Sequence, residues 1–269
     1  MTREHLFSQL WEQYTKQNPS ALDVYNSFTT LGETVLNDHI AFRTFNDPRM
    51  DIKVLEKPFL KVGYIEKGSY VFETKKLIAK HYEIPNMPNE PKVFISQLVL
   101  EDFSKDFQNL IAERINSVEN EVYKASDLIL KGNIWGAPSF KIYNRLREES
   151  EYAAWLYVYG FRANHFTVSI NSLKTLNTIE KVNQHLKDKG FKLNDSGGEI
   201  KGTPQELLQQ SSIMAEKIEV RFSDGIHSIP ACYYEFAIRY PDASGQLYNG
   251  FIAKSADKIF ESTNFYDKK

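Results

Sequence analysis

Apolar residues recur at helical spacing near the start of the chain and again in its middle. Leu6 and Leu10 lie about one helical turn apart, and Pro19 begins a second segment of the same kind. In the middle of the chain, two amphipathic stretches predict helices over Ser104–Ser117 and Ser139–Tyr159. The sequence therefore predicts two N-terminal helices and a helical region at the centre of the chain.

Strand-like runs precede this central region. The first predicted strand covers His39–Phe45, and Asp47-Pro48 opens a helix after it, because proline is tolerated in a first helical turn. Three more strands are predicted near Ser69–Thr74, Leu77–Ile84 and Val93–Leu100. The order is strand, helix and three strands.

The same order returns after the central region. A strand at Asn164–Ile170 leads into a helix from Leu176 to Lys189, which Gly190 ends. Further strands are predicted near Ile218–Phe222 and Cys232–Tyr240, with Phe191–Leu193 as a candidate for another. The stretch Gly202–Ser212 is interpreted as an insertion of uncertain form.

Two copies of one β-α-β-β-β unit account for this order. We expect a single α+β domain of two pseudo-repeats, with a first module at about 31–101, a helical connection at 102–160 and a second module at 161–269. The two modules are predicted to form one curved, half-open β-barrel with helices packed around it. The chain lacks a Gly-rich phosphate fingerprint, which argues against a Rossmann sheet.

Composition narrows the class of protein. The 269 residues are 42% hydrophobic, which is enough apolar material for one large core. A net charge of −2 gives no electrostatic argument for nucleic acid or an anionic membrane as a partner. The polar N-terminus and the lack of a long apolar run predict a cytoplasmic protein without a membrane span. The single cysteine, Cys232, excludes an intrachain disulfide and a thiolate metal cluster. Assembly into a homo-oligomer is left open.

Three predicted strands each carry a candidate metal ligand on a face of small or hydrogen-bonding residues. Side chains alternate between the two faces of a strand, so each candidate shares its face with residues two and four positions away. The faces are His39 with Ala41 and Arg43, His165 with Thr167 and Ser169, and Glu235 with Ala237 and Arg239. Two imidazoles and a carboxylate suit Fe(II), although zinc, nickel or cobalt would also bind them. The same alternation is typical of a half-exposed sheet, so the pattern alone leaves both interpretations open.

Two further residues are candidates for substrate binding. Arg43 lies four residues beyond His39, roughly 13 Å along the strand. Its fork of donors could hold the second carboxylate of a metal-bound acid, while a solvent-exposed arginine is the alternative. His227 follows the Asp224-Gly225 turn shortly before the Glu235 strand, which makes it a candidate for contact with substrate or with a metal ligand.

Four segments together resemble the 2-oxoadipate dioxygenase/decarboxylase family, which has the vicinal-oxygen-chelate, or glyoxalase-like, fold. They are Asp38-His39-Ile40-Ala41-Phe42-Arg43-Thr44, Ala163-Asn164-His165-Phe166-Thr167-Val168, Tyr233-Tyr234-Glu235-Phe236 and the ending Ala256-Asp257-Lys258-Ile259-Phe260-Glu261-Ser262-Thr263. The resemblance spans nearly the whole chain, and the motifs stand in the expected order.

The resemblance implies a site and a reaction. His39, His165 and Glu235 would hold Fe(II), and Arg43 would hold the distal carboxylate of the substrate. The implied reaction converts 2-oxoadipate and O2 into 2-hydroxyglutarate and CO2, a step of lysine breakdown. Better-known members are considerably longer, which leaves the identity of the 2-oxo acid open.

Two more residues are candidates for substrate binding, and two alternative functions remain open. Aligning the first module with the second places Gln97 opposite Glu235, so we expect its amide to contact substrate. Arg239, on the Glu235 face, is a further candidate for substrate binding. The alternative functions are a divalent-metal lyase, isomerase or hydrolase of the same fold, and a non-catalytic module that binds small acids.

Overall fold

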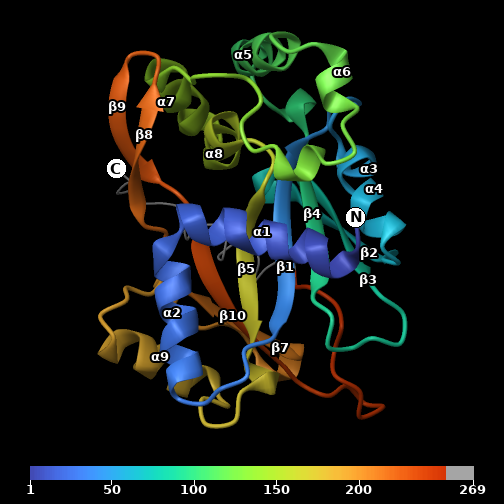
Figure 1. Cartoon of the computed structure of the whole chain (residues 1–269), viewed down its shortest axis with the longest axis vertical. Coiled ribbons are helices and arrows are strands. Elements are labelled where there is room, and N and C mark those ends of the chain that lie inside the picture. The colour runs from blue at the N-terminus through green and yellow to red at the C-terminus, as the bar shows by residue number, and fades with distance from the viewer. Residues whose placement is uncertain (253–269) are drawn as a thin grey trace.

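Eight strands form one mixed sheet in the structure, a computed structural model that describes residues 1–252 (Figure 1). β1 (Asn37–Phe45) and β5 (Ala163–Ser169) are antiparallel neighbours at its centre. Each has a parallel partner on its outer side, β4 (Lys92–Leu98) beside β1 and β10 (Tyr233–Arg239) beside β5. The outer strands are β2 (Ile65–Phe72) and β3 (Leu77–Glu83) at one end, and β7 (Leu208–Ser212) and β6 (Lys201–Thr203) at the other.

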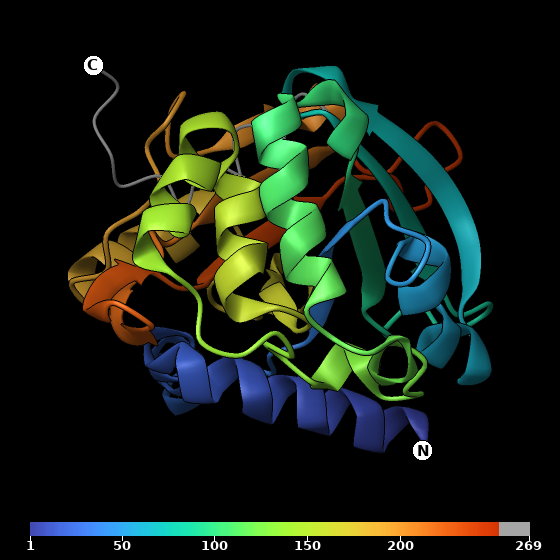
Figure 2. The ribbon, with the colours of Figure 1, turned by 90° about the horizontal axis from the view of Figure 1, so that it is seen from above.

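The sheet curls into a half-open barrel, and helices cover one face and one end (Figure 1; Figure 2). Trp11 and Tyr14 of α1 (Arg3–Gln17) pack on Phe166 and Tyr234, so this helix covers the outer face of β5 and β10. The other helices are α2 (Pro19–Thr30), α3 (Ile52–Leu55), α4 (Lys57–Lys61), α5 (Lys105–Asn116), α6 (Asn120–Tyr123), α7 (Phe140–Glu149), α8 (Glu151–Tyr159) and α9 (Ile179–Asp188). The predicted α+β half-barrel is confirmed. No helix in residues 1–252 is long and apolar enough to cross a membrane.

Serine side chains set the helix boundaries in the central region. Ser104 caps α5 by accepting from the backbone N–H of Phe107, and Ser139 caps α7 through Ile142. Ser150 has extended backbone angles and caps α8, so the single helix predicted over Ser139–Tyr159 is two helices. The predicted helices at the N-terminus and over Ser104–Ser117 are confirmed.

The largest error in the sequence prediction concerns the second half of the sheet. β8 (Lys217–Phe222) was expected in the sheet but pairs with β9 (Gly225–Pro230) in a separate hairpin. The neighbour of β10 is β7, which lies in the stretch interpreted as an insertion. Its Gln210, Ser211 and Ser212 are polar but buried, because this strand borders a polar site.

Two smaller predictions also fail. No helix begins at Asp47-Pro48; Asp47 instead holds Arg49 in a turn, and α3 begins only at Ile52, capped by Asp51. Phe191–Leu193 forms no strand and contributes a single bridge between Leu193 and Ile213.

Candidate metal centre

His39, His165 and Glu235 converge at the middle of the inner face of the sheet. They come from the adjacent strands β1, β5 and β10, and the strand register pairs Thr167 with both His39 and Glu235. One donor atom from each residue lies within 4.8 Å of the donors of the other two. The Nε2 atoms of His39 and His165 lie 3.5 Å and 3.4 Å from the Glu235 carboxylate oxygens. The structure thus brings together the three residues that the sequence singled out as metal ligands.

Burial controls the charge state of this triad. Glu235 is fully buried, and burial raises the pKa of its carboxyl to about 8. The Gln210 amide donates a hydrogen bond to the carboxylate at 2.5 Å, which opposes this rise. Burial likewise lowers the pKa of His39 and lowers that of His165 well below its usual value. Both imidazoles are therefore neutral at pH 7, the form that ligates metals.

The donor set fits a divalent metal ion. Oε2 of Glu235 is buried without a hydrogen-bond partner among residues 1–252. It faces the Nε2 atom of His165 at 3.4 Å, so a proton or a metal ion must lie between these two electron-pair donors. Two neutral imidazoles and a carboxylate on one side of an ion leave further coordination positions free.

The second ring nitrogen of each histidine is held by the preceding residue. Nδ1 of His39 lies 2.8 Å from a carboxylate oxygen of Asp38, and Nδ1 of His165 lies 3.0 Å from the amide oxygen of Asn164. With the proton on Nδ1, each Nε2 presents its lone pair to the centre of the triad. A bulge between Asn37 and His39 lets Asp38 reach the side of the strand that His39 occupies.

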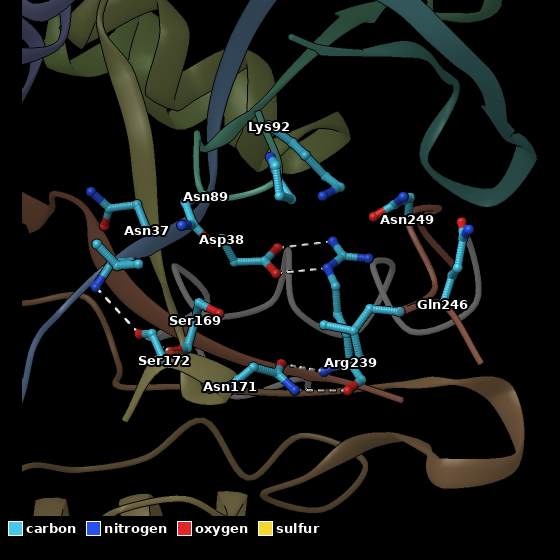
Figure 3. A pocket seen from close by; sticks show the side chains of 13 residues that line it. Asn37, Asp38, Asn89, Lys92, Ser169, Asn171, Ser172, Arg239, Gln246 and Asn249 are labelled. Atoms are coloured by element: carbon cyan, nitrogen blue, oxygen red, sulfur yellow. Dashed lines mark hydrogen bonds and ion pairs between the residues drawn. The ribbon is translucent and has the colours of Figure 1, made fainter. Parts of the chain in front are cut away.

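Arg239 fixes Asp38 in turn (Figure 3). Its guanidinium donates two hydrogen bonds to the carboxylate, at 2.6 Å and 2.8 Å. Burial alone would raise the pKa of Asp38, but the Arg239 charge holds that pKa well below its usual range. The remaining Arg239 nitrogen donates to the carbonyls of Tyr248 and Gly250. Arg239 therefore positions His39 through Asp38, and each of its three guanidinium nitrogens donates to a protein group.

Arg43 is buried beside the triad, which contradicts the solvent-exposed alternative. Its guanidinium carbon lies 4.9 Å from the ring centre of Tyr152 and 5.1 Å from that of Trp155. Nε and one terminal nitrogen of the guanidinium have no hydrogen-bond partner within the described chain. A buried arginine with unused donors is suited to pair with an anion.

Tyr233 is a residue of this site that the sequence pattern was not used to predict. It lies two residues before Glu235 on the same face of β10, and its ring stacks on that of His165 at a centroid distance of 4.6 Å. Its hydroxyl is buried without a hydrogen-bond partner among residues 1–252. Its neighbour Tyr234 points to the opposite face and packs against Trp11. The period of two, applied backwards from Glu235, would have found Tyr233.

Two predicted substrate contacts lie elsewhere. Gln97 points away from the triad, and its side-chain oxygen accepts from the backbone N–H of Ile52 at 3.0 Å. The strand registers pair His39 with Lys92 and His165 with Tyr233, so the counterpart of Glu235 is Phe94 and the alignment with Gln97 is wrong. His227, on the β8–β9 hairpin, stacks on Phe140 at 3.7 Å.

The C-terminal part of the described chain covers the triad. The ring of Phe251 lies perpendicular to His39 at 4.9 Å and also contacts Phe94 at 4.9 Å. The backbone N–H of Phe251 donates to the hydroxyl of Tyr70. The motif Ala256–Thr263 lies outside the described residues.

The fold places the chain in a class. A glyoxalase superfamily protein from Ralstonia eutropha JMP134 has the same fold, with a TM-score of 0.76 at 18% identity over 91% of this chain and 84% of that chain. A half-barrel of this kind, with a buried His-His-Glu triad on its inner face, defines a candidate metal-binding protein of glyoxalase-like fold.

The family follows from closer comparisons. Residues 5–246 match the 2-oxoadipate dioxygenase/decarboxylase family, and the chain belongs to it. It is 36% identical to the chloroplastic 2-oxoadipate dioxygenase/decarboxylase of Arabidopsis thaliana, over 96% of this chain and 76% of that protein.

Two solved structures are similar over almost their whole length. The hydroxyglutarate synthase of Oryza sativa, solved in complex with 2-oxoadipate, has a TM-score of 0.90 at 33% identity, over 97% of this chain and 91% of that chain. A protein from Shewanella frigidimarina NCIMB 400, described as a hydrolase, has a TM-score of 0.88 at 50% identity, over 93% of this chain and 97% of that chain.

Proposed function

We propose that this chain is an Fe(II)-dependent dioxygenase that decarboxylates a 2-oxo diacid of the 2-oxoadipate type. Its substrates are the 2-oxo diacid and O2, and its products are CO2 and a 2-hydroxy diacid one carbon shorter. One oxygen atom of O2 enters the new carboxylate and the other enters the new hydroxyl group. The observation that carries the proposal is the meeting of a buried His-His-Glu triad with a buried arginine that has unused donors, in a member of this family.

The triad would hold the metal. Nε2 of His39, Nε2 of His165 and the carboxylate of Glu235 would be its protein ligands, and Asp38 and Asn164 would keep both imidazoles in the ligating tautomer. When bound, Fe(II) supplies open positions where a 2-oxo acid can chelate and where O2 can be reduced. The donor set also suits zinc or nickel, so the identity of the metal as iron is itself proposed.

Arg43 would bind the far carboxylate of the substrate. It lies on the strand that carries His39, and its guanidinium lies over the rings of Tyr152 and Trp155. Anchoring both ends of the diacid removes most of its orientational freedom, an effect that can lower a barrier by roughly 7–11 kcal/mol in the best cases. The Tyr233 hydroxyl, unpartnered and stacked beside His165, would donate a further hydrogen bond to the bound acid.

Aromatic side chains would keep water from the reacting centre. Phe251 lies against His39, and Phe94 occupies the position in β4 that corresponds to Glu235 in β10. A carboxylate in place of Phe94 would offer a fourth ligand, whereas the phenyl ring leaves that side open and dry. A dry site limits side reactions of the oxidising centre.

Oxygen uptake tests the proposal. Protein loaded anaerobically with Fe(II) should consume one O2 and release one CO2 for each 2-oxoadipate, and the product should be 2-hydroxyglutarate. Zinc-loaded protein should be inactive. Turnover without O2, or turnover with zinc, would favour a lyase, isomerase or hydrolase of the same fold. Acid binding without turnover under any metal would favour a binding module.

Two coarser proposals accompany the activity. We propose that the domain consists of two pseudo-repeats, about 31–101 and 161–269 joined by 102–160, supported by the equivalent parallel pairs β1–β4 and β5–β10. We also propose a cytoplasmic location. Cell fractionation would test this location, which differs from that in the name of the Arabidopsis protein.

A further inference from the structure

A cavity lies next to the triad, and none of the three candidate metal ligands lines it. It has a volume of about 460 Å³ and opens between the start of β1, the end of β10 and the segment after β10 (Figure 3). None of His39, His165, Glu235 or Arg43 lines it. The Asp38–Arg239 ion pair forms a wall between this cavity and His39. The volume falls in the range of pockets that hold small organic ligands.

Lys92 is the unusual feature of this cavity. It is only 8% exposed, and within residues 1–252 its ammonium has no hydrogen bond or ion pair. An ammonium group has three donors, and burying it without an acceptor is costly. Lys92 is aligned with His39 on the neighbouring strand, which fixes its place beside the Asp38–Arg239 wall.

The other charges around Lys92 are already engaged. Asp38 accepts from both Arg239 and His39, and Arg239 donates to Asp38 and to two backbone carbonyls. The charge of the Glu83 carboxylate also acts on Lys92 and favours its charged form. The hydrogen-bond partner of Glu83, however, is Nε2 of His81 at 3.1 Å. Among the described residues that line the cavity, Lys92 is therefore the cation free to bind a ligand. The two nearby carboxylates disfavour a ligand as highly charged as phosphate.

Uncharged polar groups complete the lining. The amide oxygen of Asn37 is buried without a partner within the described chain. Asn89 and Asn249 also line the cavity, and no side-chain hydrogen bond occupies either amide among the described residues (Figure 3). Amides of this kind recognise hydroxyl or oxo groups that flank a carboxylate.

We propose that this cavity binds a small organic acid, with its carboxylate on Lys92 and a hydroxyl or oxo group on the surrounding amides. Arg239 cannot take the place of Lys92, because Asp38 holds it. The ligand is either an acid of the enzyme's own reaction or an unrelated hydroxy or oxo acid. Either ligand would lie against the ion pair that positions His39, so its binding would be coupled to the position of His39 in the triad.

Calorimetric titration with 2-hydroxybutyrate tests the site. This acid has one carboxylate, so it lacks the second group that Arg43 would need. Wild-type protein should bind it, and Lys92→Met should weaken binding by about tenfold or more, the loss expected for one charge-assisted hydrogen bond. Lys92→Arg should retain binding, and Lys67→Met, a change of an exposed lysine on β2, should match wild type.

Two variants of the triad region locate the binding. Arg43→Ala and His165→Ala should both still bind 2-hydroxybutyrate, because neither residue lines the cavity. Loss of binding in these variants with full binding in Lys92→Met would overturn the proposal, as would the absence of binding to wild type. Lys92→Met should fold and melt close to the wild-type temperature, because the ammonium makes no hydrogen bond or ion pair within residues 1–252. A folded, stable variant that has lost binding thus separates the site from a structural role.

Kinetics identify the source of the acid, and only this arm rests on the proposed function. If the cavity collects the enzyme's own substrate, Lys92→Met raises KM for 2-oxoadipate and leaves kcat unchanged. If it binds an unrelated acid, KM stays the same, and the effect of added 2-hydroxybutyrate on turnover disappears in the variant. Both results support the binding site. If the protein shows no turnover, the calorimetric titration still tests the site, because it does not depend on activity.

Discussion

The carboxylate of Asp38 lies 2.8 Å from Nδ1 of His39, its neighbour on the same strand. In a regular strand these two side chains would point to opposite faces, and the bulge after Asn37 brings them together. Because Asp38 is itself clamped by Arg239, the orientation and tautomer of His39 are set before any metal binds. This arrangement leads to the first prediction.

Asp38→Asn should weaken metal binding by about 10–100-fold, the usual effect of losing a carboxylate behind a ligating histidine. The asparagine keeps the size of the side chain but no longer neutralises Arg239 or fixes the His39 proton. Competition with a chelator of known affinity measures the change. Asp47→Asn, which alters a carboxylate in a turn away from the triad, is the control and should bind metal as wild type does.

His165→Ala should abolish tight metal binding and leave the fold intact. The residue contributes one of three donors, and its strand is paired on both sides independently of the imidazole. Elemental analysis of the purified variant gives the metal content, and circular dichroism checks the fold. Full metal occupancy in folded His165→Ala would refute its assignment as a ligand.

Alternation along strands is a local property, and it placed His39, Arg43, His165 and Glu235 on the inner face correctly. Register between strands depends on contacts far apart in the sequence, which is why Gln97 was aligned with Glu235 in error. The bulge that brings Asp38 to His39 breaks the alternation, so the sequence pattern could not reveal it. The β7 strand was missed because its buried Gln210 and serines look like loop residues until Glu235 is placed beside them.

The stability of the metal-free protein should depend on pH in opposite directions on the two sides of about pH 6.5. The pKa of Glu235 is raised to about 8 from 4.5, so its contribution to the free energy of unfolding is present below 4.5 and is lost as pH rises towards 8. The pKa values of His39 and His165 are lowered from 6.5, so their contribution is present above 6.5 and is lost as pH falls. Between pH 6.5 and 8 the free energy of unfolding therefore falls with rising pH, because only the contribution of Glu235 is still changing.

Thermal melts of chelator-treated protein from pH 5 to 8.5 would measure this dependence. Glu235→Gln should remove the decline above pH 6.5, because its amide does not titrate. Metal should also bind more tightly as pH rises towards 8, since binding displaces the Glu235 proton. A decline of equal slope in wild type and Glu235→Gln would show that another group is responsible.

Arg43→Ala should keep its metal but lose activity on a six-carbon 2-oxo diacid. The far carboxylate would lose a charge-assisted partner, at a cost of about 1.5–3 kcal/mol in binding and more in rate if the acid is misplaced. Arg43→Lys should rescue poorly, because a point charge cannot reproduce the planar fork that lies over Tyr152 and Trp155. Steady-state kinetics on the diacid and on a 2-oxo monoacid of equal length would measure the effect. Equal losses on both acids would mean that Arg43 does not read the second carboxylate.

Tyr233→Phe should raise KM for the diacid by about 5–10-fold, the effect of losing one neutral hydrogen bond of roughly 1 kcal/mol. Tyr234→Phe is a matched control, because its hydroxyl is also buried without a partner among the described residues but lies on the opposite face, against Trp11. Both variants remove one oxygen atom from adjacent buried tyrosines, so a general loss of packing would affect them alike. Metal content should be unchanged in both, since the Tyr233 ring that stacks on His165 is retained. KM values that rise together in the two variants would assign Tyr233 a structural role, whereas a rise in Tyr233→Phe alone places its hydroxyl on the bound acid.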